Sequence, residues 1–126
     1  MHVLLVEDDA VLSDGIARNL TNHGMVVDVV SNGRDADLAL QRRDIAVVVL
    51  DIGLPGIDGH EVARRIRAVA GGSSTLLVAL TGFGEERDRQ KSLAAGFDDH
   101  LAKPVSIAEL ESLLLHPKLA PRAATL

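Results

Sequence analysis

The chain of 126 residues contains no cysteine, tryptophan or tyrosine and only two phenylalanines. Without cysteine it cannot form disulfide bonds, thiolate metal sites or a cysteine nucleophile. Nucleic acid surfaces need basic patches or aromatic stacking platforms, whereas this chain carries a net charge of −5 and few rings. We therefore expect no direct nucleic acid binding by this domain.

Long hydrophobic runs are also missing. The longest uninterrupted apolar run, Ile45 to Leu50, has six residues, whereas a membrane-spanning helix needs about 18. The N-terminus has no basic region followed by an apolar stretch and a small-residue cleavage site, so nothing there indicates secretion. With 47% hydrophobic and 25% charged residues, the composition is that of one globular domain, which we expect to be cytoplasmic and without a membrane partner.

Five short apolar segments, several of them rich in valine, alternate with segments of helical spacing. We predict strands at residues 3–6, 25–30, 45–50, 76–80 and around 97–101. Between them, apolar residues recur three or four positions apart, as on one face of a helix; Leu12, Ile16 and Leu20 are an example. Because parallel strands need crossovers, this alternation predicts an α/β three-layer sandwich, in which helices cover both faces of a doubly wound, five-stranded parallel sheet.

The last predicted helix has the clearest end signals. Ser106 and Glu109 form a capping box, and Pro117 is expected to end the helix. Its apolar residues are expected to form one apolar face: Ile107, Leu110, Leu113 and Leu114. Since residues 116–126 contain two prolines and no periodicity, we assign residues 1–116 to the domain and residues 117–126 to a C-terminal tail or truncated linker.

Other residues receive structural assignments. Three glycines follow helical segments and are expected to end them: Gly24, Gly71 and Gly96. Three more follow the third strand without the spacing of a nucleotide-binding loop, and we interpret them as turn residues: Gly53, Gly56 and Gly59. A weaker helical pattern predicts the fourth helix around Leu93 and Ala94, and the arginines of residues 64–67 are interpreted as a solvated helix face.

Polar side chains with chemical potential follow four of the five predicted strands. They are, in strand order, Glu7 with Asp8 and Asp9 after the first, Asp51 after the third, Thr81 after the fourth and Lys103 just past the fifth. In an open parallel sheet, ligands bind outside the carboxyl ends of the strands, near the point where the strand order reverses. If the strand order is 2-1-3-4-5, these side chains converge on one small surface, and the second strand, which lacks a reactive group, lies at the edge.

This residue set fits phosphoryl transfer. Carboxylates packed together repel one another unless a cation is present, and hard oxygen ligands suit Mg²⁺. Lys103 provides a compact positive charge and Thr81 a hydroxyl donor, both suited to a phosphoryl group. Aspartate is a known covalent phosphoryl acceptor, and the transfer itself needs mainly alignment and charge neutralisation.

In order and spacing, four segments resemble the receiver domain of bacterial two-component response regulators: Val6-Glu-Asp-Asp9, Leu50-Asp-Ile-Gly-Leu-Pro-Gly-Ile-Asp-Gly59, Leu80-Thr-Gly82 and Leu101-Ala-Lys-Pro104. The resemblance covers residues 2 to about 115. It implies the flavodoxin-like receiver fold with strand order 2-1-3-4-5. It also implies a phosphorylation-dependent switch rather than an enzyme that turns over a metabolite.

The resemblance implies a role for individual residues. Asp51 would accept phosphate from a sensor histidine kinase or a phosphotransfer protein, with limited self-catalysed phosphorylation and dephosphorylation. Mg²⁺ would be bound by four groups: the side chains of Glu7, Asp8 and Asp51 and the backbone carbonyl of Gly53. Lys103 would pair with the phosphoryl group, and Thr81 would bond one of its oxygens. Asp9, one residue beyond the acidic pair, would lie outside the metal site.

The expected switch involves Thr81, His100 and Pro104. The Lys103–Pro104 peptide bond would be cis, and Thr81 would move on activation. Three residues before the lysine, the family often has tyrosine or phenylalanine, whereas this chain has His100, so we hypothesise that switching is weaker or sensitive to pH. The resemblance also implies that an output domain or effector protein reads the signal, and that a homodimer can form through the fourth and fifth helices.

Two other functions are alternatives to the receiver interpretation. Aspartyl-phosphate phosphatases also place a nucleophilic aspartate at a strand end, but they need a second aspartate two residues later, where this chain has Gly53. A degenerate receiver could act as a docking domain independent of phosphorylation. The complete set of acidic, hydroxyl and lysine residues argues against that alternative, and His100 keeps it open.

Overall fold

A computed structural model describes residues 1–41, 45–54, 56, 58–68, 74–82 and 95–119 of the chain. Its centre is a parallel sheet with the strand order β2-β1-β3-β4-β5. The strands are β1 (His2–Val6), β2 (Val26–Val30), β3 (Ile45–Asp51), β4 (Leu76–Thr81) and β5 (Asp99–Ala102). The predicted five strands and their order are therefore confirmed.

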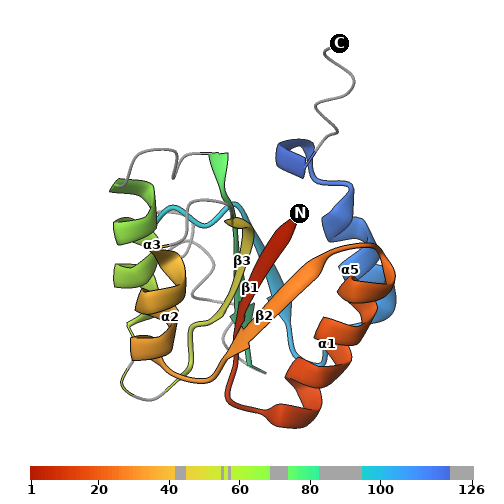
Figure 1. Cartoon of the computed structure of the whole chain (residues 1–126), viewed down its shortest axis with the longest axis horizontal. Coiled ribbons are helices and arrows are strands. Elements are labelled where there is room, and N and C mark those ends of the chain that lie inside the picture. Colours follow the sequence, from red (N-terminus) through yellow and green to blue (C-terminus); the bar gives the residue numbers. More distant parts are fainter. Residues whose placement is uncertain (42–44, 55, 57, 69–73, 83–94, 120–126) are drawn as a thin grey trace.

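Helices cover both faces of this sheet, as predicted (Figure 1). On one face lie α1 (Ala10–Asn22) and α5 (Ile107–Leu114), and on the other lie α2 (Gly33–Leu40) and α3 (Gly59–Ala68). The fourth helix predicted around Leu93 and Ala94 falls outside the described residues. The architecture is an α/β three-layer sandwich.

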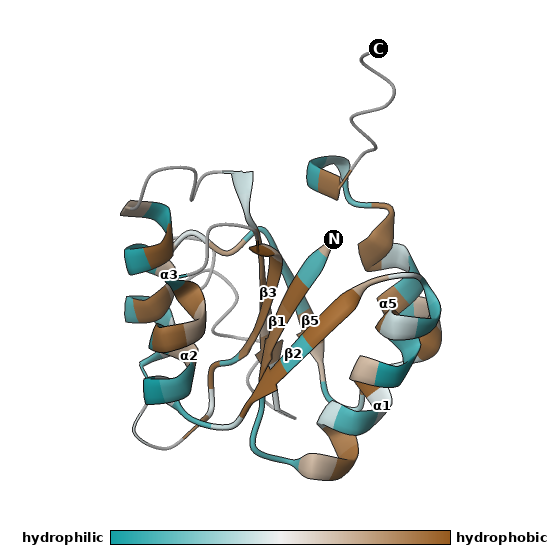
Figure 2. Ribbon diagram, in the orientation of Figure 1, coloured by the Kyte–Doolittle hydropathy of each residue, from teal (hydrophilic) through white to brown (hydrophobic). Residues whose placement is uncertain are grey.

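Two hydrophobic cores fill the spaces between the sheet and the helices. Because side chains alternate across a strand, Val3 and Leu5 of β1 point into the core under α1 and α5, while Leu4 and Val6 point into the core under α2 and α3. The strands therefore appear mainly hydrophobic in Figure 2, with hydrophilic segments in β1 and β2, while the helices carry hydrophilic residues on their outer sides. The central strands β3 and β4, which are buried on both faces, need this apolar composition most.

The capping box of α5 forms as predicted. The Ser106 hydroxyl accepts a hydrogen bond from the Glu109 N–H at 3.1 Å, and the Glu109 carboxylate accepts one from the Ser106 N–H at 3.3 Å. Ile107, the first residue of the predicted apolar face, is 64% exposed. The helix meets the core through Leu110 and Leu113, and its first residue lies outside the packed region.

The packed fold continues past the predicted end of the domain at residue 116. Pro117–Leu119 form a short 3-10 helix, η3, and Leu119 is buried against the core under α1 and α5. Lys118 adds an ion pair, with its Nζ 2.8 Å from Asp98 Oδ1. The remaining residues of the predicted tail, 120–126, lie outside the described residues.

The interpretation of residues 64–67 as a solvated face is correct for Arg64 and Arg65 and wrong for Arg67. The Arg67 guanidinium binds the Gly96 carbonyl at 2.7 and 2.9 Å, the Thr75 carbonyl at 2.7 Å and Asp98 Oδ2 at 2.6 Å. Gly96 permits this close approach because it has no side chain: a Cβ atom there would lie 2.9 Å from Arg67 Cγ. Gly24, with a φ of 85°, ends α1 as expected, and Gly71 lies outside the described residues.

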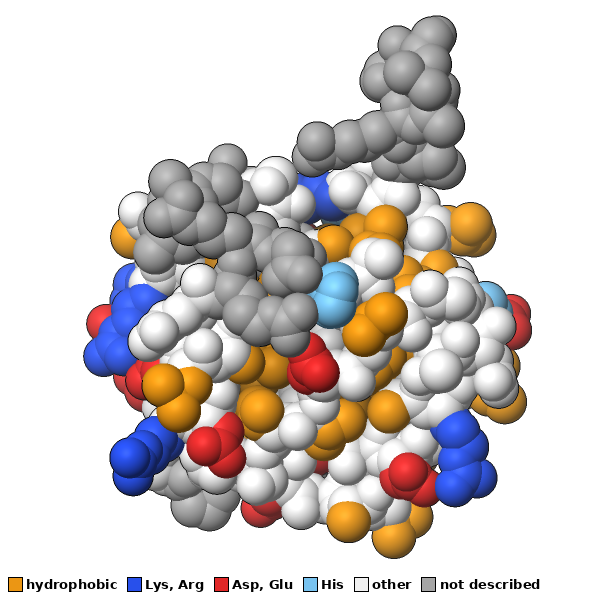
Figure 3. Space-filling view, viewed as in Figure 1, with side chains coloured by type: hydrophobic (Ala, Val, Ile, Leu, Met, Phe, Trp, Pro, Cys, Tyr) orange, Lys and Arg blue, Asp and Glu red, His pale blue; other side chains and the backbone are white. Residues whose placement is uncertain are grey.

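The surface carries charges of both signs. In Figure 3, basic side chains lie around the margin of the viewed face, acidic side chains lie at the margin and also nearer its centre, and hydrophobic side chains lie between them. Exposed ion pairs such as Arg18–Asp14, at 2.8 Å, contribute little to stability. Within the described ranges, no helix has the length and apolar character that crossing a bilayer requires.

Candidate functional site

The structure gathers the polar residues that follow strands β1, β3, β4 and β5 at one edge of the sheet. Asp51 and Thr81 are the last residues of β3 and β4, and Glu7 and Lys103 come directly after β1 and β5. The strands end nearly level with one another, because Asp51 pairs in register with Leu80 and Thr81 with Ala102. Glu7, Asp51 and Thr81 are all buried, an unusual position for two carboxylates.

Lys103 joins the two buried carboxylates. Its Nζ lies 2.6 Å from Glu7 Oε1 and donates a hydrogen bond of 2.7 Å to Asp51 Oδ2. The backbone assists this arrangement, since the Lys103 N–H donates to the Thr81 carbonyl at 2.8 Å. The Lys103–Pro104 peptide bond is cis, as predicted. One ammonium group thus supplies the positive charge between two buried acids.

Burial and hydrogen bonding move the pKa values of these groups in opposite directions. Burial raises the pKa of Glu7, and the neighbouring Asp51 raises it further against the opposing effect of Lys103. Burial also acts to raise the pKa of Asp51, but hydrogen bonds with Glu7, Lys103 and the Gly53 N–H outweigh it and lower that pKa. Desolvation acts to lower the pKa of Lys103, but its bonds to Asp51 and Glu7 raise it instead. Asp51 therefore stays ionised and Lys103 stays charged.

The acidic residues are placed to bind a divalent cation. One carboxylate oxygen from each of Glu7, Asp8 and Asp51 lies within 4.8 Å of the others. Glu7 and Asp51 are buried, whereas Asp8 is exposed and leaves the group open to solvent. An all-oxygen donor set with room for water is the coordination that Mg²⁺ prefers. The residues present therefore fit the Mg²⁺ predicted from the sequence.

Gly53 and Thr81 complete the surroundings of Asp51. The Gly53 N–H donates to Asp51 Oδ1 at 2.8 Å and so fixes the orientation of that carboxylate. The Thr81 hydroxyl, almost fully buried, donates a long hydrogen bond of 3.4 Å to the Leu101 carbonyl. Because this hydrogen bond is long and therefore weak, the hydroxyl can readily donate to a stronger acceptor instead.

Two other predicted residues lie around this group. Asp9 caps α1, with its side chain accepting from the N–H groups of Val11 and Leu12, so it is occupied outside the acidic cluster. His100 is the second residue of β5, opposite Ala79 of β4. Both nitrogens of its ring are buried, and within the described part of the chain neither has a hydrogen-bond partner.

Sequence reasoning missed the role of Gly59. It is the first residue of α3 rather than a turn residue, and it is buried against Ile52, the residue that follows Asp51. Gly56, with a φ of 75°, does occupy a turn. The sequence held one signal for Gly59: it directly follows Asp58, a residue type that often precedes the first turn of a helix.

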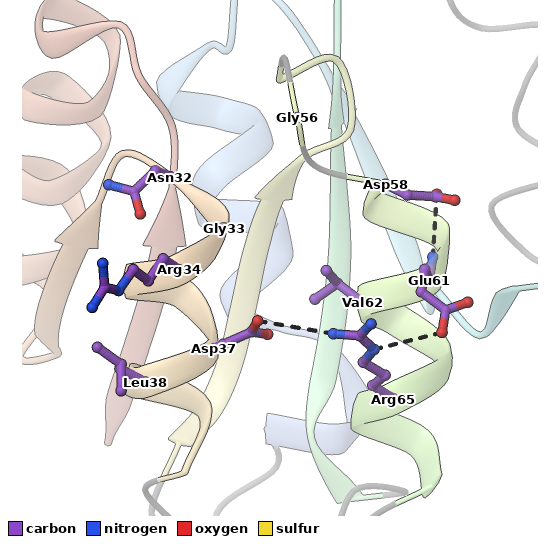
Figure 4. A pocket seen from close by; sticks show the side chains of 10 residues that line it. All are labelled: Asn32, Gly33, Arg34, Asp37, Leu38, Gly56, Asp58, Glu61, Val62 and Arg65. Atoms are coloured by element: carbon purple, nitrogen blue, oxygen red, sulfur yellow. Dashed lines mark hydrogen bonds and ion pairs between the residues drawn. The ribbon is translucent and has the colours of Figure 1, made fainter.

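A separate groove of about 730 Å³ lies between α2 and α3 (Figure 4). The Arg65 side chain extends across this groove toward α2, and its Nη1 lies 3.8 Å from Asp37 Oδ2. Its Nε lies 3.5 Å from Glu61 Oε1 on its own helix. Because Arg65 pairs with acidic residues of both helices here, we interpret the groove as part of the contact between α2 and α3 and not as a second site.

Comparisons with known proteins agree with this geometry. The sequence profile described as "Response regulator receiver domain" matches residues 3–115. The transcriptional regulatory protein TcrA of Mycobacterium tuberculosis is 42% identical over 110 residues, which cover 87% of this chain and 43% of that protein. The transcriptional regulatory protein CutR of Streptomyces coelicolor is also 42% identical, over 87% of this chain and 50% of its own length. The chain thus spans about half the length of these relatives.

Solved structures are similar too. A putative response regulator from Chloroflexus aurantiacus superposes with a TM-score of 0.85 at 27% identity, over 95% of this chain and 98% of that one. The receiver domain of sensor histidine kinase PA1611 from Pseudomonas aeruginosa gives a TM-score of 0.78 at 36% identity, over 90% and 93% of the two chains. That structure has a magnesium ion coordinated in its active site cleft.

Proposed function

Because the chain belongs to the family of response regulator receiver domains, we propose that it is a phosphorylation-dependent switch whose phosphoacceptor is Asp51. The observation that carries this proposal is the ionised, buried Asp51 carboxylate, bonded to Lys103 Nζ at 2.7 Å beside two further carboxylates. A nucleophilic carboxylate beside a fixed positive charge is what phosphoryl transfer to a side chain requires.

In the proposed reaction, a carboxylate oxygen of Asp51 attacks the phosphorus of a phosphohistidine. The new O–P bond forms as the N–P bond breaks, and the imidazole leaves with the electron pair of that bond. Glu7, Asp8, Asp51 and the Gly53 carbonyl would hold Mg²⁺, which would supply positive charge to offset the negative charge of the phosphoryl group. The chemistry is one transfer to the protein's own residue, accompanied by limited self-catalysed phosphorylation and dephosphorylation, and not the turnover of a metabolite.

Lys103 and Thr81 are proposed to respond to the new phosphoryl group. Lys103 Nζ is 2.7 Å from Asp51 Oδ2, so it can pair with a phosphoryl oxygen after a small movement. The Thr81 hydroxyl exchanges its 3.4 Å bond to the Leu101 carbonyl for a phosphoryl oxygen, because charge-assisted hydrogen bonds are the stronger ones. His100, within β5, and Pro104, two residues after its end, are proposed to carry this change to the surface.

The proposed partners follow from the family and from the length of the relatives. A sensor histidine kinase or a phosphotransfer protein in the cytoplasm would donate the phosphoryl group. Since the chain spans about half of its regulatory relatives, an output domain or effector protein would read the switch. A homodimer through the fourth and fifth helices remains a prediction, because the predicted fourth helix lies outside the described residues.

The test is the intact mass of the chain after incubation with acetyl phosphate or phosphoramidate, with and without Mg²⁺. We expect a labile gain of one phosphoryl group that requires Mg²⁺ and is lost in Asp51→Asn. Asp14→Asn is the matched control, since Asp14 is an exposed carboxylate paired with Arg18 away from the site. If neither donor nor a phosphorylated histidine kinase modifies the wild-type chain, the proposal fails and phosphorylation-independent docking becomes the better explanation.

A further inference from the structure

Gly59, the first residue of α3, packs directly against Ile52, the residue that follows Asp51. A Cβ atom added to Gly59 would lie 2.8 Å from Ile52 Cγ2 and 3.1 Å from both Cα and Cβ of Ile52. Carbon atoms in contact prefer separations of about 3.5 Å or more, so these three distances fall short by about 0.4 to 0.7 Å. Two of these atoms belong to or adjoin the backbone, and a larger residue at position 59 would therefore push the chain itself.

Ile52 sits between the two groups that the proposed chemistry uses. On one side is Asp51, and on the other is Gly53, whose N–H fixes Asp51 Oδ1 at 2.8 Å. The Ile52 N–H donates to the Leu80 carbonyl of β4 at 3.1 Å. A displacement of the Ile52 backbone would therefore pull on the Asp51 carboxylate and on the Gly53 carbonyl together.

α3 has little freedom to retreat from this contact. Its Val62, Ala63 and Ile66 are buried in the core. At its C-terminal end, Arg67 is bonded to Gly96 and Asp98. At its start, Asp58 Oδ1 accepts from the N–H groups of His60 and Glu61 at 3.1 and 3.2 Å. A clash at position 59 would therefore be relieved mainly on the side of Ile52.

We propose that Gly59 is a positioning residue for the phosphoacceptor site. Because Gly59 has no side chain, α3 packs closely against Ile52, and this contact holds residues 51–53 in the conformation that binds Mg²⁺ and accepts the phosphoryl group. This inference rests on the proposed function. Gly59 touches no reacting atom and acts only through Ile52.

The main test is Gly59→Ala, followed by two-dimensional NMR of the Gly53 amide during a Mg²⁺ titration and by the rate of phosphorylation at saturating Mg²⁺. Because displacements approaching 1 Å in an active site cost up to about a hundredfold, we expect about tenfold weaker Mg²⁺ binding and about tenfold slower phosphorylation. The Gly53 amide resonance should shift even without Mg²⁺, which a loss of stability alone would not cause.

Two glycine variants serve as controls. Gly15→Ala adds the same methyl group to α1, where nothing lies within 4 Å, and should change neither quantity. Gly24→Ala places an alanine at a φ of 85° after α1 and lowers stability without contacting α3 or Ile52, so it should leave the Mg²⁺ affinity of the folded chain unchanged. Adding Ile52→Ala removes the closest contact, and the effect of Gly59→Ala on Mg²⁺ affinity should fall to about threefold or less in that background.

If Gly59→Ala does not fold, two variants of Ile52 test the same contact. Ile52→Val keeps Cγ2 and should bind Mg²⁺ like the wild type, whereas Ile52→Ala removes Cγ2 and should bind it more weakly. The inference is overturned if Gly59→Ala behaves like Gly15→Ala, if Gly24→Ala weakens Mg²⁺ binding equally, or if the two Ile52 variants do not differ. A wild-type chain that accepts no phosphoryl group would instead overturn the proposed function, and this inference with it.

Discussion

At the level of single residues, the ammonium group of Lys103 holds two buried carboxylates together. Its Nζ is 2.6 Å from Glu7 and 2.7 Å from Asp51, and its side chain is 28% exposed. Removing one partner of a buried ion pair leaves uncompensated charge, which is much more costly than losing an exposed pair. The stability of the site therefore depends on a positive charge at this position.

We expect Lys103→Met to lower the free energy of unfolding by about 3 kcal/mol near neutral pH, because two carboxylates then face each other without a cation. Millimolar Mg²⁺ should restore more stability to this variant than it adds to the wild type, since the ion replaces the missing charge. Urea unfolding followed by circular dichroism measures both effects.

Arg64→Met is the control for Lys103→Met, because Arg64 forms an exposed ion pair with Glu61 at 3.0 Å. It should change stability little and should not alter the response to Mg²⁺. Equal unfolding midpoints for Lys103→Met and the wild type, with and without Mg²⁺, would contradict the assignment of Lys103 as the counter-ion of Glu7 and Asp51.

At the level of elements, Asp98 connects α3, β4 and η3 at the end of the sheet opposite the site. Asp98, just before β5, accepts from Arg67 of α3 at 2.6 Å and from the Leu77 N–H of β4 at 2.9 Å, and pairs with Lys118 of η3 at 2.8 Å. Burial acts to raise the pKa of Asp98, but the hydrogen bonds from Lys118, Leu77 and Arg67 outweigh it and lower that pKa.

Asp98→Asn should therefore destabilise the fold by about 3 kcal/mol near neutral pH. A carboxylate whose folded-state pKa is depressed stabilises the protein above its unfolded pKa, and this contribution is lost as the pH falls through the folded-state value. The difference between variant and wild type should stay constant down to about pH 5 and shrink below the usual pKa of 3.8. Urea unfolding across this pH range measures it.

Asp37→Asn provides the comparison for Asp98→Asn. Asp37 is 54% exposed and lies 3.8 Å from Arg65, so its loss should cost well under about 1 kcal/mol. If Asp98→Asn costs no more than Asp37→Asn, or if its cost does not shrink in acid, the cluster around Asp98 does not join these elements as described.

The sequence predicted those features that depend on local pattern. Strands, their order and the capping box of Ser106 follow from apolar runs, from family spacing and from residues three positions apart. Arg67 and Gly59 could not be assigned this way, because their roles depend on partners brought near by folding. Arg67 contacts Asp98, which is 31 positions away, and a local reading of its helix can see only an exposed charge. Gly59 is required by a contact with Ile52 that exists only once α3 packs on β3.

At the level of the whole molecule, the sequence determines the position of the site more directly than the end of the domain. The polar residues of the site were predictable because a parallel sheet places all strand ends at one edge, whatever the details of packing. The end of the packed fold was not predictable, because nothing in the composition of residues 117–119 distinguishes a tail from a final turn. Leu119 is buried only because η3 folds back onto the core formed by α1 and α5.

A chain that ends at Leu119 should therefore be more stable than one that ends at His116. Burying a leucine side chain contributes about 1.5 to 3 kcal/mol, and we expect a difference of about 2 to 3 kcal/mol in the free energy of unfolding. Leu119→Ala in the longer chain should reproduce most of this loss, whereas Lys118→Met should reproduce the smaller part due to the ion pair with Asp98. Urea unfolding of the four chains decides the matter. Equal stability of the two end points would mean that the domain ends at residue 116 and that η3 adds nothing to the fold.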